Sequence, residues 1–153
     1  MLTIRKIEEK DYDRIAILII QEFSKSPYND KWTKKEALGS IKSDLKKGQG
    51  FVALENNQVV GFILFTKEKI DKTYIFIENL VVDEKYQKKG IGRKLVQEVE
   101  NKIKEGILTL SVNKKSKAYN FYKKMRFKEN KINVNMSKRL IRSSKRIPYY
   151  KYA

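Results

Sequence analysis

The stretch that decides the fold is YIFIENLVVDEKYQKKGIGRKLV, residues 74–96. Its first part, Tyr74–Val82, is rich in aromatic and β-branched residues, which predicts a buried strand. A charged connector, Asp83–Tyr86, and a basic glycine loop, Gln87–Gly92, come next. Apolar residues then recur at helical spacing as far as residue 104, so an amphipathic helix is predicted to begin directly behind the loop.

The order strand, glycine loop, helix is one that proteins use to hold phosphates. The first turn of a helix has backbone N–H groups without intrahelical partners and a partial positive charge. Gly90 and Gly92 remove the Cβ atoms that would keep an anion away, and Lys88, Lys89 and Arg93 add positive charge. Neither the third glycine of a dinucleotide fingerprint nor the Gly-Lys-Ser/Thr of a P-loop is present. A tight turn with solvated lysines is the alternative interpretation.

The length of 153 residues suits a single domain, 1–153, that ends in a basic C-terminal segment, 131–153. Lys and Arg number 35 against 18 Asp and Glu, which gives a formal net charge of +17. This excess is spread along the chain without a periodic basic stripe, so nucleic acid is an unlikely partner. Binding of nucleic acid through the tail from Lys131 onward stays a third functional hypothesis.

The chain contains no cysteine and no histidine. Disulfides, thiolate metal sites and a cysteine nucleophile are therefore excluded, and proton transfer must use carboxylate, tyrosine, lysine or water. No signal peptide is recognised, and the apolar run Ile15–Ile20 is too short to cross a bilayer. We expect a cytoplasmic protein that does not associate with membranes.

Taken in order, the remaining residues predict a strand, two helices, two strands joined by a tight turn, then the central stretch, a further strand, a short helix and two final strands. This is an α/β (α+β) fold with a mixed, mostly antiparallel sheet of six to seven strands and about four helices, in the order β-α-α-β-β-β-α-β-α-β-β. The helical crossover makes the strand after the central helix parallel to the Tyr74 strand. The predicted ranges are Leu2–Ile7, Asp11–Lys25, a helix capped by Thr33 and Glu36, Phe51–Glu55, a turn at Asn56-Asn57, Gln58–Phe65, Ile107–Val112, Lys117–Met125 capped by Ser116, extended chain from Phe127, and Ile147–Tyr152.

The loop between the first two predicted helices, 26–32, carries two aromatic residues, Tyr28 and Trp32. Trp32 is the only tryptophan of the chain and stands just before the Thr33 cap. It either packs beside that cap or, with Tyr28, forms a wall of a substrate cleft.

Three segments together resemble the GNAT superfamily of acyl-CoA-dependent N-acetyltransferases. Gln87–Gly92 resembles the family's Q/R-x-x-G-x-G/A pyrophosphate loop, Asn113 followed by Ala118–Tyr122 resembles its second acyl-CoA motif, and Val59–Phe62 resembles its third strand. The resemblance covers roughly residues 1–135.

The resemblance implies acetyl-CoA as co-substrate, bound where the Tyr74 strand and the following parallel strand splay apart, and it requires no metal. A backbone N–H near Leu80 or Val81 would stabilise the oxyanion that forms on the thioester, a contribution of about 3 kcal/mol. The implied acetyl-CoA-binding residues are Leu80, Val81, Val82, Gln87, Lys88, Lys89, Gly90, Ile91, Gly92, Arg93, Asn113, Ser116 and Tyr119.

Two side chains are the candidate catalytic groups, Glu78 as the base or as an anchor for the amine, and Tyr122 as the acid. Period-two alternation places Glu78 on the face of the strand that carries Leu80 and Val82, close to the expected acyl site, where burial would raise its pKa. Alternatively, Glu78 faces solvent or pairs with a lysine of a neighbouring strand. The resemblance assigns Tyr122 as proton donor to the leaving thiolate, with Tyr119 as the second choice, while simple packing of both rings is the competing interpretation.

The predicted activity is transfer of an acetyl group from acetyl-CoA to a primary amine by direct attack in a ternary complex. The acceptor is expected to be a small amine, polyamine- or aminoglycoside-like, bound by Tyr28, Trp32 and Glu78. The alternatives are a peptide or protein amine, N-terminal or lysine, and a non-catalytic acyl-CoA-binding module. The tyrosine-rich tail could add a strand to a second copy of the chain, so a homodimer is possible.

One position departs from the family pattern. Arg126 stands before Phe127, where family members usually carry a glycine that ends the short helix in a left-handed conformation. Either Arg126 adopts that conformation, at a cost of about 1 kcal/mol, or the helix ends differently.

Overall fold

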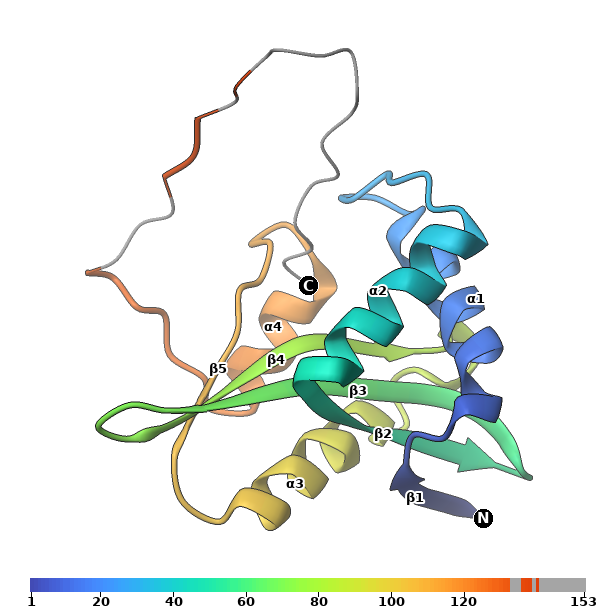
Figure 1. Cartoon of the computed structure of the whole chain (residues 1–153), viewed down its shortest axis with the longest axis horizontal. Helices are drawn as coiled ribbons and strands as arrows, with labels where there is room; N and C mark the ends of the chain where they lie inside the picture. Colours follow the sequence, from blue (N-terminus) through green and yellow to red (C-terminus); the bar gives the residue numbers. More distant parts are fainter. Residues whose placement is uncertain (133–135, 139, 141–153) are drawn as a thin grey trace.

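The sheet at the centre of the molecule has five strands, which lie side by side in the order of the sequence (Figure 1). They are β1 (Leu2–Lys6), β2 (Gly48–Glu55), β3 (Gln58–Lys69), β4 (Thr73–Val82) and β5 (Ile107–Thr109). β1 to β4 pair antiparallel, and β5 pairs parallel to β4, as the helical crossover predicts. The computed structural model describes residues 1–132, 136–138 and 140.

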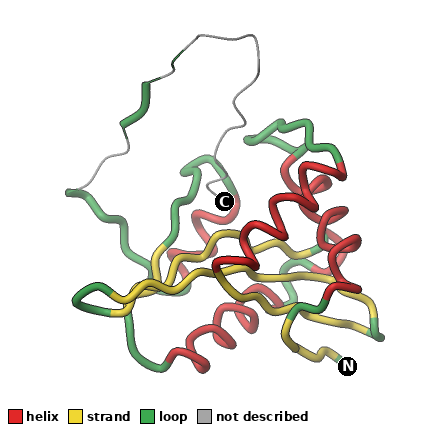
Figure 2. The backbone as a smooth tube through the Cα atoms, viewed as in Figure 1, coloured by secondary structure: helices red, strands yellow, loops and turns green. Residues whose placement is uncertain are grey.

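Four α-helices cover this sheet, as Figure 2 shows in its tube view. They are α1 (Tyr12–Phe23), α2 (Lys34–Lys47), α3 (Ile91–Ile103) and α4 (Lys117–Lys124), with short 3-10 turns at Glu9–Asp11 and Glu84–Tyr86. α1 and α2 lie on one face of the sheet and α3 lies on the other (Figure 1). The mixed, mostly antiparallel architecture and the number of helices agree with the prediction.

Each face of the sheet buries its own apolar cluster. The α1–α2 cluster lies under α1 and α2 and contains Ile15, Ile19, Phe23, Ile41, Val52, Phe62 and Val81 among others. The α3 cluster lies on the opposite face and contains Val60, Ile63, Phe65, Ile75, Ile77, Leu95, Val99 and Tyr122 among others. Because both faces are covered, β3 is apolar along most of its length instead of alternating.

Local signals in the sequence produce the predicted turn and cap. Asn56 and Asn57 both have positive φ, 50° and 63°, which is the backbone that a two-residue hairpin requires. At the start of α2 the Thr33 hydroxyl accepts from the Glu36 N–H at 3.2 Å, while the Glu36 carboxylate accepts from the Thr33 N–H at 2.8 Å. Both predictions are confirmed, because the groups involved are neighbours in the chain.

An irregularity in β4 contradicts the alternation predicted for that strand. In the pairing with β3, Leu64 lies opposite Asn79 and Phe65 lies opposite Ile77, so Glu78 is an extra residue of β4. Ile77 packs in the α3 cluster and so does Leu80, three residues later. Side-chain alternation therefore changes phase at Glu78, and the prediction that Glu78 shares a face with Leu80 and Val82 is wrong.

β4 and β5 pair only over their first residues. The last pair joins Phe76 to Thr109, and β4 then runs on to Val82 without β5 beside it. β5 ends at Thr109, earlier than the predicted Val112. Residues 77–82 thus present one edge of β4 that β5 leaves unpaired.

The number of strands is lower than predicted. The described part of the chain forms five strands instead of six to seven, and the expected extended pairing after Phe127 is absent from residues 127–132. The other expected strand, Ile147–Tyr152, lies outside the described residues.

The C-terminal end of α4 shows which backbone conformation Arg126 adopts. Arg126 has φ 68°, the left-handed conformation in which family members usually place glycine. Its N–H donates to the Lys123 carbonyl at 3.0 Å, and the Phe127 N–H donates to the Tyr122 carbonyl at 3.0 Å. These bonds terminate the helix as a glycine would, and the backbone of Arg126 carries the strain.

Replacing Arg126 by glycine is expected to stabilise the protein, because glycine adopts a positive φ without steric strain. We expect Arg126→Gly to raise the free energy of unfolding by roughly 0.5–1 kcal/mol, part of the gain being offset by the greater freedom of glycine in the unfolded chain. Chemical denaturation of both proteins measures the difference. Arg126→Ala, which loses the same side chain and keeps the strained Cβ, is the matched control, and an equal gain in the two variants would contradict the explanation.

Candidate active site

The N-terminus of α3 offers backbone donors to an anion. Gly90 occupies the N-cap position with φ 82°, and no side chain caps the helix or places an acidic group in its first turn. The first backbone bond of the helix is donated by the Lys94 N–H to the Gly90 carbonyl at 3.1 Å. The N–H groups of residues 91–93 precede that bond and are oriented for a ligand at the helix end.

The two glycines of the loop have different roles. A Cβ built on Gly90 would meet nothing within 4 Å, so the space in front of this backbone is open to a ligand. A Cβ on Gly92 would lie 3.3 Å from the ring of Phe121 in α4. Gly92 therefore allows close packing of α3 against α4, and the open space lies at Gly90.

Positive charge surrounds the open side of the loop. Lys88, Lys89 and Arg93 are exposed, and Lys88 also has a positive φ, 62°. The Lys89 ammonium lies 5.3 Å from the centre of the Tyr86 ring. None of the three cations forms an ion pair with a described residue, so their charge is available to an anion.

Gln87 links the glycine loop to its surroundings. Its side-chain Nε2 donates to the Val82 carbonyl at 2.8 Å, at the C-terminal end of β4. Its Oε1 accepts from Lys117 Nζ at 2.8 Å, and the same ammonium lies 3.5 Å from Glu22 Oε1 on α1. Lys117, the first residue of α4, thereby joins the glycine loop to α1, a role that no pattern in the sequence predicts.

Glu78 is partly exposed and faces β3. Its Oε1 accepts a hydrogen bond from the Thr66 hydroxyl at 2.8 Å. Thr66 follows Phe65, which belongs to the α3 cluster, so Thr66 and Glu78 lie on the face that α1 and α2 cover. The other carboxylate oxygen makes no hydrogen bond to a described residue and is available to a substrate.

Tyr122 is 4% exposed and is held by aromatic neighbours. The rings of Phe121 and Phe127 meet it edge to face, with centroids 5.1 and 5.2 Å away. Burial, and to a lesser degree the nearby Tyr28, raises the pKa of the Tyr122 phenol above its ordinary value. Tyr122 therefore keeps its proton through the neutral range.

Tyr28 and Trp32, the two aromatic residues of the loop between α1 and α2, both pack partly buried against the α1–α2 cluster. Burial raises the pKa of Tyr28, and a hydrogen bond with the Ser116 hydroxyl opposes the rise. This contact and the influence of Tyr28 on Tyr122 bring the α1–α2 loop to α4. Trp32 packs partly buried against the α1–α2 cluster, which is the structural alternative considered for it.

The residues before α4 have mainly local partners. Asn113 Oδ1 accepts from the Lys115 N–H at 2.8 Å, and the buried Ser116 hydroxyl donates to the Asn113 carbonyl at 2.7 Å. Ser116 occupies the N-cap position of α4 as predicted, but its side chain accepts no capping hydrogen bond. The Tyr119 hydroxyl donates to Glu129 at 2.8 Å, so it is engaged on the protein surface.

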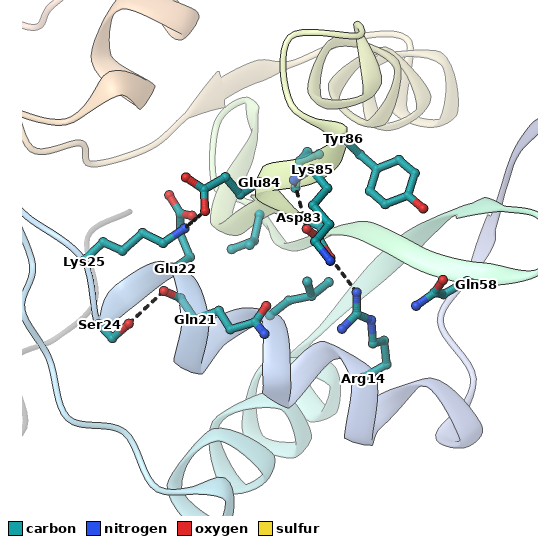
Figure 3. A pocket seen from close by; sticks show the side chains of 13 residues that line it. Arg14, Gln21, Glu22, Ser24, Lys25, Gln58, Asp83, Glu84, Lys85 and Tyr86 are labelled. Carbon is teal, nitrogen blue, oxygen red and sulfur yellow. Dashed lines mark hydrogen bonds and ion pairs between the residues drawn. The ribbon is translucent and has the colours of Figure 1, made fainter.

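A cavity of about 500 Å³ lies between α1 and the connector that leads from β4 to the glycine loop (Figure 3). Four of its charged residues form two ion pairs: Arg14 with Asp83 at 2.6 Å, and Lys25 with Glu84 at 2.8 Å. Arg14 Nε also donates to the Val59 carbonyl at 3.1 Å. Arg14 thus anchors the connector to α1 and β3. No periodic pattern in the sequence distinguishes it from other surface cations.

The arrangement combines a strand edge that β5 leaves unpaired, an uncapped helix N-terminus with nearby cations, and the side chains of Glu78 and Tyr122. Among the residues that the structure describes, no group of three or more acidic residues could hold a metal ion. In the same part of the chain, no helix combines the length and the apolar character that a bilayer span requires.

Comparison of the sequence with protein families gives one match, to the acetyltransferase (GNAT) domain, over residues 46–129. This range includes β3, β4, the glycine loop, α3, β5 and α4, and it is more than half of the chain. No curated protein matches the sequence significantly.

Solved structures share the fold at low sequence identity. A possible acetyltransferase from Clostridium difficile 630 superposes with a TM-score of 0.77 at 24% identity, over 92% of this chain and 99% of that chain. A predicted acetyltransferase with acetyl-CoA from Clostridium acetobutylicum gives 0.69 at 17% identity, over 90% and 96%. An aminoglycoside N-acetyltransferase in complex with CoA gives 0.71 at 14% identity, over 92% and 96%.

The family match covers the structural elements that form the anion site, the open edge of β4 and the helix that carries Tyr122. On this basis, the chain belongs to the acetyltransferase (GNAT) domain family and is an acetyl-CoA-dependent N-acetyltransferase.

Proposed function

We propose that the protein transfers the acetyl group of acetyl-CoA to the primary amine of a small molecule, by direct attack in a ternary complex. The observation that carries the proposal is the open edge of β4 beyond the Phe76–Thr109 pair, which runs from Glu78 at one end to the uncapped α3 N-terminus at the other. Such an edge can pair with the amide groups of a pantetheine arm.

The glycine loop would hold the pyrophosphate. The N–H groups of residues 91–93 donate to it, and Lys88, Lys89 and Arg93 neutralise its charge. Gln87 must release Val82 if that carbonyl is to bind the arm, because the Gln87 amide occupies it at 2.8 Å. Asn113, Ser116 and Tyr119 are proposed to contribute from the β5–α4 side.

The reaction would begin with loss of a proton from the protonated amine to the free carboxylate oxygen of Glu78. The amine nitrogen then attacks the thioester carbon, and the negative charge on the carbonyl oxygen meets a backbone N–H of Leu80 or Val81. The tetrahedral adduct collapses as the carbon–sulfur bond breaks, and its electron pair goes to sulfur. The sulfur accepts a hydrogen bond from Tyr122 and takes up the proton that the attacking nitrogen loses as the amide forms, while Glu78 releases the first proton to solvent.

The raised pKa of Tyr122 refines its proposed role. A thiol has a pKa near 8.5 and an ordinary phenol a pKa near 10, so a phenol with a still higher pKa gives up its proton reluctantly to a thiolate. Tyr122 is therefore proposed to stabilise the leaving sulfur mainly by hydrogen bonding.

A small-molecule acceptor is supported by two features. One solved structure with this fold is an aminoglycoside N-acetyltransferase, and an acidic side chain, that of Glu78 on β4, lies at the proposed acceptor side. Carboxylates attract the protonated form in which alkylamines exist at neutral pH.

The proposal is tested by supplying acetyl-CoA with a panel of small amines, a peptide with a free N-terminus and a lysine peptide, and following release of free thiol. We expect turnover with at least one small amine and much slower turnover with both peptides. Tight CoA binding without turnover of any amine would instead support a non-catalytic acyl-CoA-binding module.

Replacing Glu78 by glutamine removes the proposed base while preserving the side-chain size. We expect Glu78→Gln to lower kcat about 100-fold or more at neutral pH, with the affinity for CoA unchanged. The deficit should shrink as pH rises toward 10, because more of the amine is then already deprotonated. Glu68→Gln, an exposed position on β3 with the same change of charge, is the control, and wild-type kinetics in the Glu78 variant would disprove the role.

Replacing Tyr122 by phenylalanine removes the hydroxyl and keeps the packing against Phe121 and Phe127. We expect Tyr122→Phe to lower kcat about 10- to 100-fold through loss of the hydrogen bond to sulfur, with CoA binding retained in calorimetry. Tyr119→Phe is the matched variant: its kcat should stay close to wild type, and any change should fall on the KM for acetyl-CoA, which Tyr119 is proposed to help bind. A larger loss in the Tyr119 variant would transfer the acid role to that residue.

A further inference from the structure

The carbonyl of Val82, the last residue of β4, points to the edge that β5 leaves open. On the opposite edge the next residue, Asp83, donates its N–H to the Val60 carbonyl of β3 at 2.8 Å. Backbone groups of successive strand residues point to opposite edges, so the Val82 carbonyl faces away from β3. The Gln87 Nε2 donates to this carbonyl at 2.8 Å. Gln87 therefore occupies the last acceptor that the open edge offers.

Lys117 holds the Gln87 amide in this orientation. The Lys117 ammonium donates to Gln87 Oε1 at 2.8 Å and lies 3.5 Å from Glu22 Oε1. An ammonium only donates hydrogen bonds, so the amide oxygen must face Lys117 and the NH₂ group is left to face the Val82 carbonyl. The Lys117 side chain is 60% exposed, so it can turn away without opening the core. The position of Gln87 thus depends on a cation that is free to move.

Lys117 lies on the side of α4 that faces the start of α3. Phe121 is one helical turn further along α4, and its ring would lie 3.3 Å from a Cβ on Gly92. Residues four apart share a helix face, so Lys117 projects from the face that contacts the glycine loop. A pyrophosphate bound by the N–H groups of residues 91–93 carries more negative charge than the single carboxylate of Glu22. It would therefore attract the Lys117 ammonium away from Glu22 and Gln87.

Departure of Lys117 would leave Glu22 with another cation close by. Glu22 also acts on Lys25, whose pKa is raised first by its hydrogen bond with Glu84 and further by the charge of Glu22. The strong penalty for an isolated buried charge therefore does not apply to Glu22 when Lys117 turns away. The exchange of partners by Lys117 is accordingly inexpensive.

We propose that Gln87 and Lys117 select a phosphate-bearing co-substrate by controlling access to the open edge of β4. In the absence of phosphate, the Gln87 amide covers the Val82 carbonyl. A phosphate at the α3 N-terminus withdraws Lys117, Gln87 turns away, and the carbonyl accepts an amide N–H of the pantetheine arm. This rests on the proposed function, in which the arm lies along β4. Gln87 and Lys117 determine which co-substrate binds and do not touch the thioester.

The test measures the affinity for pantetheine, which has the arm and no phosphate, with and without saturating inorganic pyrophosphate. NMR titration suits the weak binding expected of such fragments. Wild type is compared with Gln87→Leu, which lacks the amide, and with Lys117→Met, which lacks the ammonium and keeps the length of the side chain. Lys124→Met is the matched control, because Lys124 is exposed at the other end of α4 and its replacement removes the same charge.

We expect pyrophosphate to lower the Kd for pantetheine about three- to tenfold in wild type and in the Lys124 variant, the range that one hydrogen bond contributes. Gln87→Leu should bind pantetheine alone as tightly as wild type does with pyrophosphate, and both Gln87→Leu and Lys117→Met should respond little to pyrophosphate. A direct contact between the two ligands would persist in the Gln87 variant. A wild type that ignores pyrophosphate, or a response that survives in both variants, would overturn the proposal.

The titration contains no amine and measures no turnover, so its outcome is separate from that of the proposed function. Acetyl transfer without coupling between pyrophosphate and pantetheine rejects the role of Gln87 and Lys117 and leaves the function standing. Coupling without turnover of any amine supports that role and rejects the function. The side-chain NH₂ signal of Gln87 gives a direct readout: pyrophosphate alone should shift it in wild type and much less in Lys117→Met, and equal shifts in the two proteins would contradict the withdrawal of Lys117.

Discussion

One additional residue in β4 determines where the proposed chemistry can occur. Glu78 has no counterpart on β3, and the strand changes phase there while remaining in the sheet. The change puts Glu78 and Asn79 on the face covered by α1 and α2, whereas Leu80 returns to the α3 cluster. An unbroken alternation would place Glu78 and Leu80 together and turn the carboxylate away from Thr66.

Features that depend on neighbours in the chain could be predicted from the sequence. The Asn56-Asn57 turn, the Thr33 cap and the glycine loop before α3 are specified by side-chain and backbone groups a few residues apart. The bulge at Glu78 could not be predicted in this way, because it arises from pairing with a strand more than ten residues away. The same holds for Arg14, Lys117 and Asp44, whose partners lie on other elements.

Only part of the candidate site could therefore be predicted from the sequence. The loop Gln87–Gly92 precedes α3 as predicted, and Gly92 also serves helix packing. Trp32 packs against the α1–α2 cluster, which is one of the two interpretations that the sequence left open. The positive charge of the chain likewise indicates a site only when the positions of the charged residues are known. The net charge of +17 identifies no site, whereas Lys88, Lys89 and Arg93, which form no ion pair with a described residue, do so because they lie in front of an uncapped helix end.

The open edge of β4 also has a consequence for solubility. Unpaired backbone groups on a strand are a template on which any extended chain can add, which is a common start of aggregation. Here the Gln87 side chain already donates a hydrogen bond to the carbonyl of Val82, the last residue of β4, and Lys117 donates to the Gln87 amide oxygen. The pantetheine arm of acetyl-CoA, lying along the remaining backbone groups, would shield them. Bound co-substrate would therefore also protect the open edge of β4 from pairing with other chains.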